Sequence, residues 1–136
     1  MPSPKLDALL SLAIRRREAG CCVYCGRAID PRVEVLTVDH LLPRVWWPAG
    51  KEAALNQPSN LAASCGLCNG LKGAMDVPAF AAMLDTYGAL LSGPYAYLAG
   101  VRGDDVKARV DAAIATPLDW AGARVALALL NAQRGR

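Results

Sequence analysis

The sequence predicts an α+β fold, in which two short strands and a short helix are flanked by an N-terminal helix and a C-terminal helical region. Two Cys-x-x-Cys pairs, Cys22 with Cys25 and Cys65 with Cys68, are the first observation. Four thiolates on two tight turns can surround one Zn²⁺ at about 2.3 Å and join distant segments. A β-branched run at residues 33–38 predicts a strand between the pairs, so we expect a small zinc-stabilised α+β unit.

The N-terminal helix is predicted from its ends and its apolar spacing. Ser3 and Pro4 read as an N-cap and a first-turn proline, and Gly20 ends the pattern. The apolar residues at helical spacing are Leu6, Leu9, Leu10, Ala13 and Ile14. Arginines 15–17 occupy the last turns, where cations complement the helix dipole, and this structural interpretation is at least as good as phosphate binding.

Cys21 is the fifth cysteine and lies outside the knuckle spacing, so we expect a buried free thiol that packs as a small hydrophobe. For the other four, unpaired thiols or a redox pair are the alternatives, and a closed Cys₄ zinc site is the simplest account. An odd number of cysteines and no secretory signal pattern favour a reduced, cytoplasmic setting.

The predicted strand ends at Asp39 and His40, and residues 41–59 lack any periodicity and are predicted to be a loop. In that loop Trp46 and Trp47 either pack as a lid or stack on a base, and the lid is the favoured interpretation. Arg44 and Lys51 are the better candidates for nucleic-acid phosphate contacts. A second short strand is expected at residues 60–63, and a short helix at residues 69–74.

Three further helices are predicted in the Ala-rich C-terminal part. The first opens at Asp76 and Pro78 and stops at residues 93–94; the second spans residues 104–115; the third begins at residues 116–117, with Asp119 completing a capping pattern. Their predicted core residues are Phe80, Met83, Leu84, Tyr87 and Leu91, then Val106, Val110 and Ile114, and then Trp120, Ala123, Leu127 and Leu130. We therefore divide the chain into residues 1–74 and a helical region, 75–136, packed on or appended to the first part.

Several submotifs within the first part occur in a recognisable order: Asp39-His40, then Asn60-Leu61, then Cys65-Gly66-Leu67-Cys68-Asn69-Gly70-Leu71-Lys72. At these residues, within roughly 22–73, the sequence resembles the HNH nuclease family. The resemblance implies a ββα-metal (His-Me) finger that cuts phosphodiester bonds. Asn69 stands where the family often has histidine, which resembles its HNN variant.

The resemblance also implies catalytic roles. His40 is the general base, and Asn60 ties the loop after the first strand. His40 is the only histidine, so a catalytic cation would be held by oxygen ligands, Asp39 and Asn69, which suit Mg²⁺ or Mn²⁺. Lys72 is either a phosphate contact or a solvated lysine, with equal weight.

Charge adds modest support for a nucleic-acid partner. Residues 1–74 hold nine Lys and Arg against six Asp and Glu, whereas residues 75–136 hold six of each. We expect a metal-dependent endonuclease, with DNA favoured, RNA and oligomeric state left open, and no membrane span. The alternative is a non-catalytic zinc-stabilised nucleic-acid-binding module, which would not need Asp39, His40 and Asn69 together. A weaker third hypothesis is an interaction module that acts through the C-terminal helices.

Overall fold

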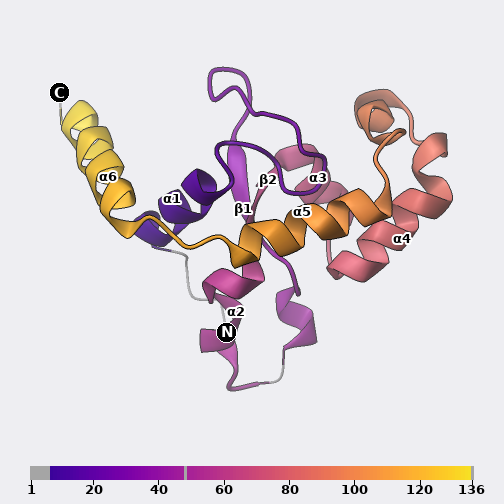
Figure 1. Cartoon of the computed structure of the whole chain (residues 1–136), viewed down its shortest axis with the longest axis horizontal. Coiled ribbons are helices and arrows are strands. Elements are labelled where there is room, and N and C mark those ends of the chain that lie inside the picture. The colour runs from indigo at the N-terminus through magenta and orange to yellow at the C-terminus, as the bar shows by residue number, and fades with distance from the viewer. Residues whose placement is uncertain (1–6, 48, 136) are drawn as a thin grey trace.

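The computed structural model describes residues 7–47 and 49–135 and confirms the α+β prediction (Figure 1). Two antiparallel strands, β1 (Leu36–His40) and β2 (Leu61–Cys65), are followed directly by α3 (Gly66–Lys72). These three elements are called the ββα unit. The flanking helices are α1 (Ala8–Arg17), α4 (Val77–Tyr87), α5 (Gly103–Ala115) and α6 (Trp120–Arg134). Short helical turns complete the chain: η1 (Arg44–Trp46), α2 (Glu52–Leu55), η2 (Pro58–Asn60), η3 (Gly88–Leu90) and η4 (Gly93–Leu98).

The first residues of β1 and of α3 differ slightly from the prediction. β1 begins at Leu36 and not at Val33, because the amides of Val33 and Glu34 donate to the carbonyl of Asp30 and form a turn there. α3 begins before the predicted Asn69, because the side chain of Cys65 accepts a hydrogen bond from the Cys68 amide and caps the helix. Helix formation therefore starts inside the second cysteine pair.

The N-terminal helix starts at Ala8, with Asp7 as its cap accepting a hydrogen bond from the Leu10 amide at 2.7 Å. The predicted cap residues Ser3 and Pro4, and the predicted core residue Leu6, lie outside the described residues. Ala13 and Ile14 are buried, as their spacing predicts, and Leu9 and Leu10 are half-buried.

The end of α1 is fastened to the outer edge of β2 by a buried ion pair. Arg17 and Glu18 have side chains that are only 1% and 6% exposed. Arg17 donates to the carbonyl oxygens of Pro58 and Leu61, and Glu18 accepts from the Ala63 amide at 2.8 Å. This member of the arginine cluster is therefore a structural residue that satisfies strand backbone.

The C-terminal region shares a hydrophobic core with the ββα unit. The Tyr24 and Phe80 rings meet edge to face at 5.3 Å, and Leu98, Val106 and Val110 pack into the same cluster. α5 packs on α4 and also contacts β2, whereas α6 packs on α1 and projects from the body (Figure 1). The two parts of the chain thus fold around one core.

The predicted helix caps and stripes of this region are correct in part. Asp76 caps α4 as predicted. α6 starts later than predicted, at Trp120, because Asp119 is the N-cap and accepts from the Gly122 amide. The residues predicted to be core that are exposed instead are Tyr87, Ile114, Trp120 and Leu130. Their helices bury narrower faces than the spacing suggests, and these faces include the small residues Ala81, Ala113 and Ala123.

The predicted loop at residues 41–59 contains the short helices η1, α2 and η2, which the sequence reading missed because each is about one turn long. Trp47 donates to the Leu42 carbonyl, and Trp46, 60% exposed, donates across the fold to the Ala74 carbonyl at 2.8 Å.

Among the described residues, no single helix is long and apolar enough to cross a membrane. α5 and α6 pass such a test only as a pair, and they meet at a bend of 92°.

Candidate metal centre and catalytic residues

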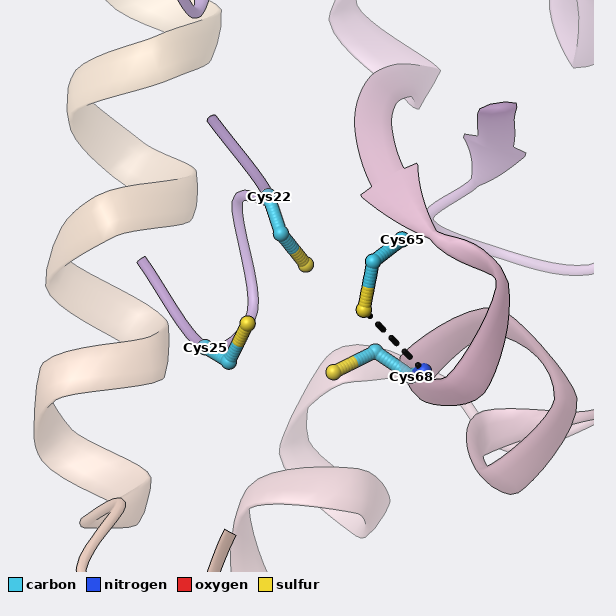
Figure 2. Close-up of side chains that lie close together, drawn as sticks. All are labelled: Cys22, Cys25, Cys65 and Cys68. Atoms are coloured by element: carbon cyan, nitrogen blue, oxygen red, sulfur yellow. Dashed lines mark hydrogen bonds between the residues drawn. The ribbon is translucent and has the colours of Figure 1, made fainter. Parts of the chain in front are cut away.

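Four cysteine side chains converge on one point. Cys22 and Cys25 come from the turn after α1, Cys65 from the end of β2 and Cys68 from α3, and their sulfur atoms point toward one another (Figure 2). All four sulfurs lie within 4.8 Å of one another. Tetrahedral bonds of about 2.3 Å to zinc place sulfurs about 3.8 Å apart, so the cluster needs only a small contraction to close on the ion. The donor set and its spacing fit a Zn²⁺ ion.

The thiols are already polarised within the cluster. The hydrogen bond from Cys22 lowers the pKa of the Cys25 thiol to about 6. Hydrogen bonds with Cys22 and Cys25 also lower the pKa of Cys65. Hydrogen bonds with Cys25 and Cys65 raise the pKa of Cys22, and hydrogen bonds with the other three thiols raise the pKa of Cys68. The Cys68 amide donates to Cys65 Sγ at 3.4 Å, the dashed line in Figure 2. All four thiols would have to lose their protons to bind Zn²⁺, so metal binding at this cluster would depend on pH.

Asp39, a predicted cation ligand, lies in a buried ionic contact. Its carboxylate oxygen Oδ2 is 3.0 Å from the Lys72 ammonium and accepts a hydrogen bond from the Tyr24 hydroxyl. The Lys72 side chain is fully buried, and its Nζ also donates to the His40 carbonyl at 3.0 Å. Burial, together with the Asp39 charge, raises the pKa of Tyr24, so its hydroxyl stays protonated and donates. Asp39 thus has a cationic partner within the protein.

Asn69 contacts a different residue of β1. Its Nδ2 donates to Thr37 Oγ1 at 3.2 Å, while Lys72 contacts Asp39. The two pairs follow from geometry, because positions three apart share a helix face and positions two apart share a strand face. α3 therefore lies along β1 with Lys72, and not Asn69, opposite Asp39. The oxygen donors suit Mg²⁺ chemically, but the Lys72 ammonium competes for the same carboxylate.

His40 ends β1 and is half-buried. Its Nε2 lies 2.7 Å from Asn56 Oδ1. The loop that follows is fastened by Asn60, whose side-chain oxygen accepts from the Leu42 amide at 2.8 Å. Asn60 Nδ2 donates to the carbonyls of Leu42 and Leu55, and the Leu41 amide donates to the Asn60 carbonyl. These contacts are the ones expected from the resemblance, in which Asn60 ties the loop after the first strand.

The three predicted phosphate contacts divide into two kinds. Arg44, the first residue of η1, and Lys51, which immediately precedes α2, are exposed in the segment after His40. Lys72 is 1% exposed, so in this arrangement its ammonium faces Asp39 and the His40 carbonyl and not solvent. The interpretation of Lys72 as a solvated lysine is wrong.

Some residues of the site were not singled out from the sequence. Tyr24 lies between the first two cysteines and Asn56 lies in the predicted loop, and neither stands in a recognisable motif. Arg27 and Tyr97 lie beside the cysteine cluster. Hydrogen bonding to Glu34, with a smaller contribution from Cys65, raises the pKa of Arg27. Of these residues, only Tyr24 could have been suspected from the sequence, because it lies between Cys22 and Cys25.

The first prediction concerns the cysteine cluster. The variant Cys65→Ser should lose the single bound zinc and lower the melting temperature strongly, because binding energy at a closed Cys₄ site is folding energy. Zinc analysis and thermal unfolding measure both effects. Cys21→Ser is the matched control. Because Cys21 lies outside the cluster, this variant should bind zinc as wild type does. If the Cys65→Ser variant kept the zinc content and melting temperature of wild type, the assignment of the four cysteines as a zinc site would be wrong.

The second prediction concerns Lys72. Lys72→Met should lower the free energy of unfolding by about 3–5 kcal/mol, because it leaves the buried Asp39 carboxylate without its counter-charge. Chemical denaturation measures the change. Lys107→Met, at an exposed position of α5, should stay within about 0.5 kcal/mol of wild type. Equal stability of the two variants would show that the Asp39–Lys72 pair carries little of the fold's stability.

Comparison with known proteins agrees with this geometry. Residues 22–75 match the family model described as HNH endonuclease. No curated protein and no solved structure is similar enough to the chain to count as a match. The matched segment contains both cysteine pairs, both strands and α3. The resemblance inferred from the sequence is therefore confirmed over this segment, residues 22–75, which matches the HNH endonuclease family.

Proposed function

We propose that this protein is a metal-dependent HNH endonuclease that hydrolyses phosphodiester bonds, with DNA as the favoured substrate. The observation that carries the proposal is the family match over residues 22–75, because that segment includes all four residues assigned to catalysis. These residues are His40, Asp39, Asn60 and Asn69.

In this proposal His40 is the general base. An imidazole that donates its Nε2 proton to Asn56 Oδ1 keeps Nδ1 as the nitrogen that can accept a proton. His40 then takes a proton from the water that attacks phosphorus. Asn56 fixes the ring, and Asn60 fixes the loop that follows, so the base keeps one orientation.

The proposed cation is Mg²⁺ or Mn²⁺, with Asp39 and Asn69 as its protein ligands. When bound, such an ion stabilises the negative charge that develops on the phosphate and the leaving oxygen. Hard oxygen donors support this choice of metal. Because the Lys72 ammonium lies 3.0 Å from Asp39, the protein must share or reorganise that contact for the carboxylate to serve as a ligand. Weak binding of the cation is the expected consequence.

Substrate would approach over the segment that follows His40. Arg44 and Lys51 are exposed there, and their charges can meet backbone phosphates without reading sequence.

The second candidate, a non-catalytic zinc-stabilised nucleic-acid-binding module, is favoured by one observation. Asp39 already has two partners inside the fold, and Asn69 contacts Thr37. A binding module would need only a zinc site, the ββα unit and exposed cations, and the fold has a candidate for each.

His40→Ala separates the two candidates. The enzyme proposal requires cleavage of plasmid DNA by the zinc-loaded protein with Mg²⁺ to fall by about a hundred- to ten-thousand-fold, since the variant lacks the base. Zinc content, melting temperature and DNA affinity should stay near wild type. Gln57→Ala, at an exposed position of the same segment, is the control and should cleave normally.

The outcomes of that experiment are distinct. Unchanged cleavage by His40→Ala would remove His40 as the base. If wild type binds DNA and RNA but cuts neither, the binding module replaces the enzyme.

A further prediction concerns the proposed cation. Mild chelation should abolish cleavage, and added Mg²⁺ or Mn²⁺ should restore it while zinc stays bound, because oxygen ligands hold hard cations weakly. Asn69→Ala should need a higher Mg²⁺ concentration for half-maximal cleavage, as seen in a metal titration. Full activity of folded, zinc-loaded protein in EDTA would contradict the proposed mechanism.

A further inference from the structure

A tyrosine from outside the matched segment contacts two of the zinc-site sulfurs. The Tyr97 hydroxyl lies 3.1 Å from Cys68 Sγ and 3.5 Å from Cys65 Sγ. Tyr97 belongs to η4 and follows Cys68 by 29 residues. Because a metal-bound thiolate can only accept a hydrogen bond, the hydroxyl must be the donor once the ion is bound.

An arginine lies on the other side of this tyrosine. The Arg27 guanidinium is 5.0 Å from the centre of the Tyr97 ring, and its two terminal nitrogens pair with Glu34. Its remaining nitrogen, Nε, is the one buried side-chain nitrogen or oxygen without a hydrogen-bond partner in the described part of the chain. Cys65 is close enough to interact electrostatically with this guanidinium. The Arg27 side chain is 37% exposed, but its Nε is buried, and a buried donor without a partner is costly unless a nearby negative charge offsets that cost.

The Cys₄ site supplies that charge. Four thiolates around one Zn²⁺ carry a net charge of about −2, and three of the four cysteines are buried. Such a charge is unfavourable at a site removed from water unless positive groups lie near it. Arg27 brings a full positive charge, and Tyr97 brings a hydroxyl dipole aimed at two sulfurs.

We propose that Arg27 and Tyr97 stabilise the zinc–thiolate charge from outside the ligand set, and that zinc retention therefore depends on the C-terminal region through Tyr97. Partners of this kind orient metal ligands and tune their basicity, and their loss typically weakens metal binding by about 10- to 100-fold. The proposal concerns metal retention and is independent of whether the protein cleaves nucleic acid.

The test uses full-length, zinc-loaded protein and a chromogenic zinc chelator. Tyr97→Phe keeps the ring and removes only the hydroxyl, so it should weaken zinc binding by about 10- to 100-fold and speed zinc release. Tyr95→Phe is the matched control from the same turn, since Tyr95 packs on the core and should release zinc at the wild-type rate. Release by Tyr97→Phe at the wild-type rate would overturn the proposal, as would equal acceleration by both variants.

Cobalt gives a readout that simple loosening of the fold does not move. In Co²⁺-substituted protein, Tyr97→Phe should shift the thiolate-to-cobalt charge-transfer band to lower energy, because a hydrogen bond to sulfur lowers the energy of its lone pair. Tyr95→Phe should leave the band in place. An unshifted band in Tyr97→Phe would show that the hydroxyl does not act on the sulfurs.

A second pair of variants tests Arg27. Arg27→Gln should release zinc faster than wild type because it removes the positive charge near Cys65. Glu34→Gln breaks the ion pair but keeps that charge, so it should not speed release. Faster release by Glu34→Gln to the same extent would assign the effect to the ion pair and remove Arg27 from the proposal.

Discussion

The convergence of four cysteine side chains on one site is the constraint on which the rest of the structure depends. Cys22 and Cys25 stand before the first strand, and Cys65 and Cys68 stand where the second strand becomes a helix. Joining them fixes α3 against β1 and brings Tyr24 into the core beside Phe80. A two-stranded sheet is marginal by itself in water, so it needs further support. The packing of α5 against β2 gives part of it, and a metal ion bound by the four cysteines would add a cross-link.

The alignment of α3 along β1 decides which polar side chains of the two elements meet. Thr37 and Asp39 share one strand face, and Asn69 and Lys72 share one helix face. Their pairing puts an ammonium, and not an amide, beside the Asp39 carboxylate. The result is a buried group of polar contacts next to His40, at the end of β1.

Local patterns predicted much of this structure. Both cysteine pairs, the strand ending at His40 and the Asp76 cap depend on neighbours in sequence, and such signals are visible in a single chain. The burial of Lys72 was missed, because it depends on which residue of α3 lies opposite Asp39, a tertiary contact. Tyr97 was missed for the same reason: nothing near it in sequence indicates that its hydroxyl meets two sulfurs.

The outer edge of β2 has a consequence for the association of this protein with other chains. An unpaired strand edge is a template to which another strand can add, and natural proteins commonly protect such edges. Here the Ala63 amide donates to Glu18, the Ala63 carbonyl accepts from Val23, and the Leu61 carbonyl accepts from Arg17. Side chains and one loop amide thus occupy the groups that a third strand would need. The sheet cannot add a strand at this edge. Self-assembly by strand addition is therefore blocked there, although no further strand among residues 7–47 and 49–135 covers the edge.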